Sequence, residues 1–263
     1  GVAGRGGKLC KRKSMRAIVI GATSGIGRAV AGLMAEEGWT VGIAGRRREM
    51  LESFVAEHPG ADIRISDFDV TAEDSPSRLM DLIGRTGGAD LIFIVSGVGK
   101  QNRELDPDIE LNTVKVNCLG YVRMADAAFR YFRERSKAEP GFRGHLAIVS
   151  SVAGTKGMGT GPAYSSTKRF QSTYLDSLAQ LSRMNGFPLD VTDIRPGFVR
   201  TDILSRDKNY PMLMTVQYAS ELIFNALKRR RRRAYIDWRF ALLAFLWSIV
   251  PQCLWERMTG FKS

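Results

Sequence analysis

Short runs of apolar residues alternate with longer mixed stretches along most of the chain. The apolar runs predict strands at residues 16–20, 40–44, 63–68, 91–95, 145–150, 190–194 and 234–238. The stretches between them predict helices at residues 28–37, 47–57, 104–135, 162–185 and 215–227. Strands that alternate with helices form a parallel sheet covered on both faces. The pattern therefore predicts a three-layer α/β/α fold in a single domain, residues 15–237.

The two ends of the chain depart from this alternation. Residues 1–14 are glycine-rich and basic, and we expect a disordered tail, an upstream extension or a segment foreign to the natural protein, with Met15 as a candidate start. Residues 238–263 form an apolar extension whose core, residues 240–250, is too short to cross a bilayer as a helix. Three roles stay open for this extension: a lid over the substrate, a contact between subunits, or a peripheral contact with a membrane surface.

The net charge of +12 is concentrated in two short segments. Residues 1–14 contain five basic residues and no acid, and residues 228–233 are a lysine followed by five arginines. The rest of the chain is nearly neutral, so we expect no nucleic-acid partner. Arginines beside an apolar run suit an anionic lipid surface, although a solvated helix end is the plainer interpretation.

The cysteines indicate a reducing compartment. Cys10, Cys118 and Cys253 are scattered, odd in number and without metal-ligand spacing. We therefore expect a cytoplasmic protein with neither a disulfide framework nor a metal site. The hydrophobic content of 44% excludes disordered and collagen-like chains.

A glycine-rich turn lies between the first predicted strand and the first predicted helix. Its glycines permit a tight turn, close approach of the backbone to a pyrophosphate, and packing of the helix on the strand. The helix N-terminus also offers unpaired N–H groups and the positive end of a dipole to phosphates. The turn therefore predicts a dinucleotide site, with candidate contacts at Gly21, Thr23, Ser24, Gly25, Ile26 and Gly27.

The end of the second predicted strand indicates which dinucleotide is bound. An acid at this place would hold the ribose 2′-hydroxyl of NAD, but the chain has Gly45 followed by Arg46, Arg47 and Arg48. Guanidinium groups pair well with the 2′-phosphate of NADP. We expect Arg46 and Arg47 to favour NADP(H) over NAD(H), with a solvated basic helix start as the plainer alternative.

Three polar residues suggest acid–base chemistry on a carbonyl. Ser151 ends a predicted strand, and Tyr164 and Lys168 lie four residues apart on one face of the next helix. Lys168 and a cationic nicotinamide are expected to depress the pKa of Tyr164, so that its phenol exchanges a proton with a ketone or alcohol. Ser151 would hydrogen-bond the same oxygen. The same spacing is common in surface pairs, so these residues alone do not establish catalysis.

Taken together, the motifs resemble the short-chain dehydrogenase/reductase family over residues 15–203. The resembling positions are the glycine turn, Asp69, Val70, Asn117, Ser151, Tyr164, Lys168, Pro196, Gly197 and Thr201. The resemblance implies a Rossmann-type doubly wound sheet and an oxidoreductase that interconverts a carbonyl and a secondary alcohol. It also implies a homodimer or homotetramer. The alternative is a non-catalytic dinucleotide-binding regulator on the same fold, against which the intact catalytic set argues.

The resemblance assigns roles to individual residues. Asn117 matches the helix residue whose kinked backbone anchors a proton-relay water, and Lys168 would bind the nicotinamide ribose as well as lower the pKa of Tyr164. Asp69 and Val70 would hold the adenine. The loop that fixes the nicotinamide would contain Pro196, Gly197, Val199 and Thr201.

One stretch departs from the family pattern. The family usually has Asn-Asn-Ala-Gly after the fourth strand, and this chain has Ile94-Val95-Ser96-Gly97. Ser96 and Gly97 still let the backbone pass close to the adenosine ribose, but the hydrogen bonds of both asparagines must be replaced. Residues 198–214 are expected to form a lid, and with the apolar tail they favour a lipophilic substrate.

Overall fold

Seven parallel strands form one sheet in this computed structural model, which describes residues 14–201, 210 and 212–258. The strands are β1 (Arg16–Ile20), β2 (Thr40–Gly45), β3 (Ile63–Asp67), β4 (Leu91–Ile94), β5 (Gly144–Val149), β6 (Leu189–Pro196) and β7 (Arg233–Ile236). Their order across the sheet is β3-β2-β1-β4-β5-β6-β7. The predicted doubly wound parallel sheet is confirmed, and each strand begins and ends within two residues of its predicted bounds.

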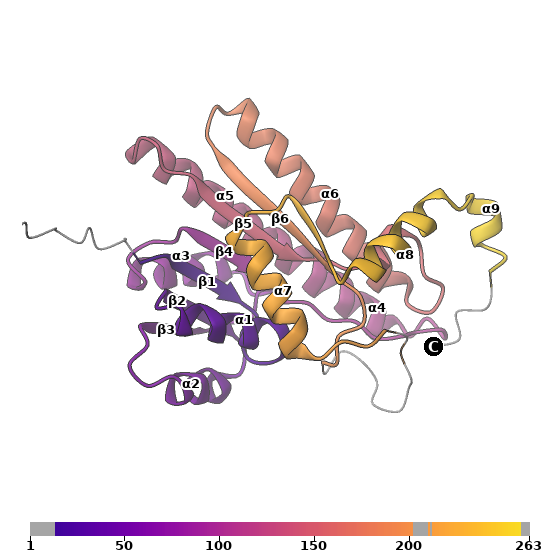
Figure 1. Cartoon of the computed structure of the whole chain (residues 1–263), viewed down its shortest axis with the longest axis horizontal. Coiled ribbons are helices and arrows are strands. Elements are labelled where there is room, and N and C mark those ends of the chain that lie inside the picture. The colour runs from indigo at the N-terminus through magenta and orange to yellow at the C-terminus, as the bar shows by residue number, and fades with distance from the viewer. Residues whose placement is uncertain (1–13, 202–209, 211, 259–263) are drawn as a thin grey trace, which may run out of the picture.

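Helices cover both faces of the sheet (Figure 1). The helices α1 (Gly25–Glu36), α2 (Arg48–Glu57), α7 (Val216–Lys228) and α8 (Trp238–Ile249) contribute to the apolar core on one face. The other face is covered by α3 (Ser75–Arg85), α5 (Tyr121–Ala138) and α6 (Pro162–Met184). The C-terminal extension is thus helical as predicted, and α9 (Gln252–Trp255) follows α8. The helix α3 was not predicted.

The core is built by alternation along buried strands. On β1, Ala17 and Val19 face one apolar cluster, and Ile18 and Ile20 face the other. All four side chains are at most 1% exposed. A strand covered on both faces needs apolar residues at every position, which explains the unbroken apolar runs in the sequence. Burying each such isoleucine or valine stabilises the fold by about 1.5–3 kcal/mol.

The predicted helix at residues 104–135 contains a break in its hydrogen-bond pattern. It begins as α4 (Pro107–Val114), passes through the π-helical turn η1 (Lys115–Gly120) and continues as α5. Asn117 lies inside this turn and is fully buried. π-Helical turns inside α-helices commonly mark functional sites. The kink expected at Asn117 is therefore present.

The arginine run lies at the opposite edge of the sheet from the apolar extension. It precedes β7, whereas α8 follows the carboxyl end of that strand, so about 13 Å of strand separates them. Several of its cations are paired across the fold, namely Lys228 with Glu37, Arg230 with Asp190, and Arg232 and Arg233 with Asp176. The arginine run and the apolar extension therefore lie at opposite ends of β7.

Candidate active site

The glycine turn has the geometry of a phosphate-binding loop. Gly21 has φ +98°, and a Cβ at this position would lie 2.6 Å from the Ser96 backbone nitrogen. A Cβ at Gly27 would lie 2.1 Å from the Gly21 carbonyl oxygen, so neither position accepts another residue. Within the described part of the chain, Ser24 at the N-cap of α1 makes no side-chain cap to the helix. The first N–H groups of α1 are thus left for a ligand, as a phosphate site requires.

Two arginines border this turn. Arg47 Nη2 donates to Thr23 Oγ1 and to Ser24 Oγ, each at 2.9 Å, and so lies across the turn. Arg46 lies 3.8 Å from the Asp69 carboxylate and is two-thirds exposed. Both guanidinium groups therefore border the end of β2, where the ribose of a bound dinucleotide is expected.

The residues after β3 and β4 complete this side of the site. Asp69 Oδ1 accepts hydrogen bonds from the backbone and the hydroxyl of Thr71, each at 2.8 Å, and Val70 is buried against Gly120. The buried Ser96 hydroxyl has no hydrogen-bond partner among the described residues. A buried hydroxyl without a partner is costly unless a ligand satisfies it. Together with the glycine turn, this orphaned group fits a dinucleotide.

Backbone bonds and Asn117 replace the two missing asparagines. The Val95 and Ser96 N–H groups both donate to the Ile20 carbonyl, at 2.8 and 2.9 Å. Asn117 accepts from the Val98 N–H at 2.9 Å through Oδ1 and donates to the Val98 carbonyl at 2.8 Å through Nδ2. The loop after β4 is therefore tied on both sides.

The loop after β6 closes the site from the other side. Val199 is buried and pairs with Met214. A Cβ at Gly25, on the glycine turn, would lie 3.2 Å from Thr201 Cγ2, so this loop reaches that turn. Of the predicted lid, residues 202–209 and 211 lie outside the described residues. The expected nicotinamide loop is thus brought beside the glycine turn.

The helix α8 forms a wall behind this loop. Phe240 on α8 is fully buried, and a Cβ at Gly197 would lie 2.2 Å from its ring. The Phe198 ring lies edge-on to Phe240 at 6.2 Å between centroids. Gly197 is therefore required by packing as well as by any contact with the cofactor, and the extension supports the site directly.

Ser151 and Tyr164 meet at the carboxyl edge of the sheet. Ser151 follows β5, and its Oγ accepts from the Ala153 N–H at 3.1 Å as the cap of a short 3₁₀ turn. Tyr164 lies in the first turn of α6, and its hydroxyl is hydrogen-bonded with Ser151. A Cβ at Gly99 would lie 2.3 Å from the Tyr164 ring, so the loop after β4 packs on the tyrosine. The predicted pair is thus assembled.

Lys168 is buried one helical turn beyond Tyr164. Its Nζ donates to the Val149 carbonyl at 2.9 Å and to Gln171 Oε1 at 3.1 Å. The same nitrogen lies 5.8 Å from the centroid of the Tyr164 ring. Burial lowers the pKa of Lys168 to about 8, while the charge of Asp193 acts in the opposite direction.

The expected depression of the Tyr164 pKa does not come from the protein's own groups. Burial raises this pKa above its ordinary value, and the hydrogen bond with Ser151 opposes the rise. Lys168 directs two hydrogen bonds to other acceptors. Without the cofactor, desolvation of the phenolate therefore sets the direction of the shift. The predicted depression includes the charge of the nicotinamide and stays a prediction.

Several supporting residues were not found from the sequence. Thr167 Oγ1 accepts from Asn117 Nδ2 at 3.0 Å, and Gln171 Nε2 donates to the Asn117 carbonyl at 2.9 Å. Asp193 is 1% exposed, and its negative charge raises the pKa of Lys168. The Glu110 carboxylate accepts from the Ala163 N–H at 2.9 Å, next to Tyr164. One signal in the sequence could have pointed to such residues, namely a polar residue on a strand or helix face that is otherwise apolar and buried.

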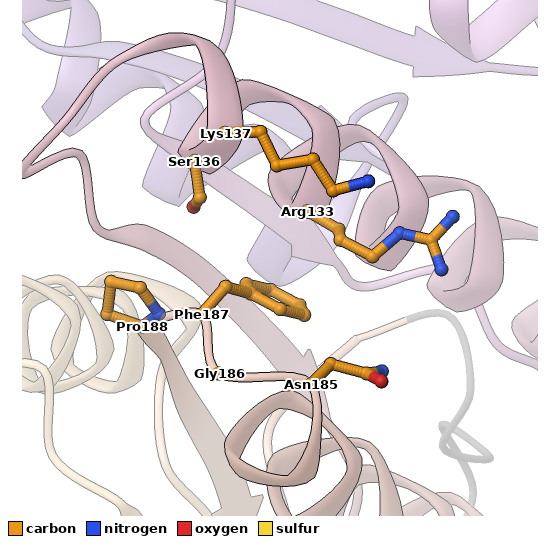
Figure 2. Close-up of a pocket in the computed structure, with 7 residues that line it drawn as sticks. All are labelled: Arg133, Ser136, Lys137, Asn185, Gly186, Phe187 and Pro188. Carbon is orange, nitrogen blue, oxygen red and sulfur yellow. The ribbon is translucent and has the colours of Figure 1, made fainter.

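The structure also has a surface pocket of about 460 Å³, whose lining side chains are drawn in Figure 2. Its lining comes from the end of α5 and from the connection between α6 and β6. Because α6 has 23 residues, Tyr164 and this pocket are about 30 Å apart along the helix. The Arg133 and Lys137 side chains at the pocket both pair with Glu134. The pocket is therefore not part of the candidate active site.

The C-terminal helices carry exposed apolar side chains. On α8 these are Trp238, Leu242, Phe245, Leu246 and Ile249, each at least 46% exposed. In the part of the chain that the structure describes, no helix is both long enough and apolar enough to cross a membrane. Lys156 Nζ donates to the Val250 carbonyl at 2.9 Å, and Trp255 Nε1 donates to the Gly157 carbonyl at 2.8 Å. These two bonds tie the extension to the loop between Ser151 and Tyr164.

Comparisons with known proteins agree with this site. A family model described as short chain dehydrogenase matches residues 15–210. An uncharacterized oxidoreductase of Myxococcus xanthus is 32% identical over 247 residues, which cover 91% of this chain and 94% of that protein. An uncharacterized oxidoreductase of Mycobacterium tuberculosis is 25% identical over 246 residues, covering 89% of this chain and 94% of that protein.

Solved structures show the same fold. A 3-ketoacyl-ACP reductase from Sinorhizobium meliloti has a TM-score of 0.72 at 25% identity, covering 87% of this chain and 99% of that one. A short chain dehydrogenase/reductase from Burkholderia phymatum, solved with NAD, has a TM-score of 0.77 at 19% identity, covering 89% and 92%. The family model, the Myxococcus relative and the assembled site lead to one conclusion: the chain belongs to the short-chain dehydrogenase/reductase family of NAD(P)-dependent oxidoreductases.

Proposed function

We propose that this chain is an NADP(H)-dependent oxidoreductase that interconverts a lipophilic carbonyl compound and the corresponding secondary alcohol. The observation that supports the reaction most is the meeting of Ser151, Tyr164 and Lys168 at the carboxyl edge of the sheet, beside the glycine turn. When bound, the nicotinamide supplies or accepts the hydride at its C4 atom. The substrate carbon therefore has to lie between this edge and the loop after β6.

The side chains divide the acid–base work. In the reducing direction, the Tyr164 hydroxyl gives its proton to the carbonyl oxygen of the substrate. The Ser151 hydroxyl, which is hydrogen-bonded with Tyr164, orients the same oxygen and stabilises the charge that develops on it. The Lys168 ammonium places a positive charge near the tyrosine and so stabilises its phenolate.

Replacing Tyr164 tests the reaction. NADPH oxidation should be screened over steroid, acyl, sugar and quinone carbonyls, and the best substrate used to compare the wild type with Tyr164→Phe. We expect turnover to fall about 100-fold or more because the proton donor is lost. NADPH binding, measured by fluorescence, should change little. Equal turnover would refute the assignment, and NADPH binding without turnover of any carbonyl would favour the non-catalytic regulator.

The preference for NADP(H) rests on Arg46 and Arg47. Both guanidinium groups border the end of β2, where the 2′-phosphate would lie. We expect Arg46→Ser and Arg47→Ser to lower kcat/KM for NADPH about tenfold while changing that for NADH little, since an exposed charged contact contributes about 1–2 kcal/mol. Arg48→Ser is the matched control, because Arg48 pairs with Glu52 and Asp67 instead. A wild type that prefers NADH would overturn the proposal.

The exposed face of α8 supports contact with a lipid surface and with it a lipophilic substrate. Basic side chains lie near both ends of the face, since Arg239 is the second residue of α8 and Lys156 donates to the Val250 carbonyl after its last turn. The carboxylate at the start of α8, Asp237, is already paired with Arg239. An apolar face with a cationic rim matches an anionic bilayer surface.

Vesicle flotation tests this contact. Truncation near Asp237 would also remove the buried Phe240, so a point substitution on the exposed face is the cleaner variant. We expect Phe245→Glu to lower binding to vesicles that contain anionic lipid, whereas Met184→Glu, at a more exposed apolar site on α6, should not. Light scattering of both variants measures the homodimer or homotetramer that family membership suggests. Loss of assembly without loss of flotation in Phe245→Glu would assign the face to a second copy.

A further inference from the structure

Gln171 links two groups that the reaction depends on. It lies on α6, three residues after Lys168, and is 2% exposed. Its Oε1 accepts from Lys168 Nζ at 3.1 Å, and its Nε2 donates to the Asn117 carbonyl at 2.9 Å. One side-chain amide therefore connects the buried ammonium to the π-helical turn, which lies about 50 residues earlier in the chain.

The orientation of this amide follows from its neighbours. A lysine ammonium has only donors, and a backbone carbonyl has only lone pairs. The amide must therefore present its oxygen to Lys168 and its nitrogen to Asn117, as it does here, because the flipped form would oppose donor to donor. Both ends are satisfied, so the side chain is fixed in a buried site.

The family resemblance implies that the kinked backbone at Asn117 anchors a proton-relay water. In this chain the Asn117 carbonyl is joined to Lys168 by Gln171. A water molecule can receive a proton on one side and release another on the opposite side. A neutral amide neither gains nor loses a proton near neutral pH, so it holds a charge in place without passing protons on.

The bridge also directs the remaining bond of the lysine. An ammonium group has three N–H donors, and two of those on Lys168 are taken by Val149 and Gln171. The third is not used by either of these acceptors, and the Tyr164 ring centroid lies 5.8 Å from the nitrogen. The two acceptors thus fix the position of the ammonium near Tyr164.

We propose that Gln171 is a positioning residue that fixes the Lys168 ammonium by joining it to the Asn117 carbonyl in the π-helical turn. This inference rests on the proposed function of the same site. Its consequence is that the ammonium is misplaced when the side chain at position 171 offers no acceptor.

The protonation of Lys168 offers a readout that does not depend on turnover. The titratable groups that face it are Asp193 on β6, Cys118 in η1 and Tyr164 on α6. In Gln171→Met, the ammonium loses an acceptor and keeps these neighbours, so the pKa of Lys168 should fall below its value of about 8. In Gln171→Glu, the new carboxylate should raise the same pKa.

NMR of the cofactor-free protein labelled with [13Cε]lysine measures this titration directly. The Lys168 signal is identified by its absence in Lys168→Met. Gln180 lies exposed on the same helix, so Gln180→Met and Gln180→Glu are matched controls that should leave the titration unchanged. If Gln171→Met does not fold, the rise in Gln171→Glu still decides the question. Equal Lys168 titrations in the wild type and both Gln171 variants would overturn the proposal.

Steady-state kinetics test the positioning role. With the best carbonyl substrate, we expect Gln171→Met to lower kcat about tenfold with little change in KM or NADPH binding, because misplacing a catalytic group acts on the chemical step. The alkaline limit of its pH profile should move to lower pH, and that of Gln171→Glu to higher pH. Unchanged profiles in both would also overturn the proposal. If Tyr164→Phe turns over substrate like the wild type, the proposed function fails. The NMR titration of Lys168 tests the role of Gln171 independently of that outcome.

Discussion

Lys168 illustrates how a single buried charge is supported. The side chain is 4% exposed, and this burial lowers its pKa to about 8. The carboxylate of Asp193, 1% exposed on β6, opposes that effect. Asp193 is itself held by Arg195 at 2.7 Å and by the hydroxyl of Ser150 at 2.5 Å. A buried anion beneath the site thus keeps the ammonium charged.

Removing this anion should shift the pH dependence of the reaction. In Asp193→Asn, the pKa of Lys168 should fall further below 8, so the ammonium is lost at lower pH. We expect the alkaline limit of kcat/KM for carbonyl reduction to move to lower pH. The control is Asp190→Asn on the same strand, whose carboxylate pairs with Arg230. If Asp193→Asn and Asp190→Asn have the same alkaline limit of kcat/KM, Asp193 does not act on Lys168.

At the scale of elements, α6 is capped from another helix. Its N-cap residue is Gly161, which has no side chain to accept from the first N–H groups. Glu110 on α4 takes this role by accepting from the Ala163 N–H, and its second oxygen accepts from Asn102 Nδ2 at 2.9 Å. Asn102 is buried and bonds the Thr160 carbonyl through its backbone N–H. This network fixes the turn of α6 that contains Tyr164, the proposed proton donor.

Loss of the cap should reduce both stability and rate. We expect Glu110→Ala to lower the free energy of unfolding by about 1–2 kcal/mol, the cost of losing a helix cap. It should also lower kcat more than it changes KM, since Tyr164 follows the capped residue. Urea unfolding and steady-state kinetics measure the two effects. Asn112→Ala, an exposed change on α4, is the control, and a Glu110→Ala protein with unchanged kcat would contradict the positioning effect.

At the scale of the whole molecule, the two ends of the parallel strands differ in function. The carboxyl ends form the carboxyl edge of the sheet, and the amino ends form the amino edge. The carboxyl edge gathers the glycine turn, the catalytic residues and the loop after β6. The amino edge is stabilised by paired charges, including Asp190 with Arg143 and Arg230. His145 on β5 is 3% exposed at this edge and lies 2.8 Å from Thr192 Oγ1. Burial lowers the pKa of His145 to about 3.

This histidine makes stability depend on pH. Its pKa is about 3 in the folded protein and about 6.5 in an unfolded chain, so between these values only the unfolded state binds the proton. Stability should therefore be complete above pH 6.5 and fall as the pH falls toward 3. At pH 5 the loss from this residue is about 2 kcal/mol.

Urea unfolding at pH 7.5 and pH 5 measures the effect. His145→Gln keeps a polar group next to Thr192 but removes the titration, so the drop between the two pH values should shrink by about 2 kcal/mol. His58→Gln, at the partly exposed end of α2, is the matched control. A drop that is the same in the wild type and His145→Gln would assign the acid sensitivity to other groups.

Much of the fold could be predicted because it is recorded in local patterns. Apolar runs mark β1, β2, β4 and β5, and β3 and β6 mix apolar with polar residues. Their alternation with helices predicts the doubly wound sheet. The helix α3 was missed although Leu79, Leu82 and Ile83 have helical spacing and are buried. The neighbouring loops are rich in polar residues and glycine, so the short amphipathic pattern of α3 did not stand out in the sequence.

The candidate site was predictable in part. Tyr164 and Lys168 are separated by one helical turn and the glycine turn is continuous in sequence, so the family's motifs could be recognised from local spacing taken together. Gln171 and Asp193 could not be assigned, because their partners come from distant segments and any buried polar residue has many candidate partners. The rise that burial causes in the Tyr164 pKa could not be foreseen for the same reason, since desolvation is set by the surrounding fold.

The sequence by itself determined the parallel sheet and the glycine turn and named the candidate catalytic side chains, since these depend on periodicity and on motifs a few residues long. Only the tertiary structure decided which groups touch them. It placed the arginine run away from the apolar extension, set Glu110 at the start of α6 and joined Lys168 to Asn117 through Gln171. The physical reason is that burial and charge act through space, and neighbours in space are fixed by packing rather than by distance along the chain.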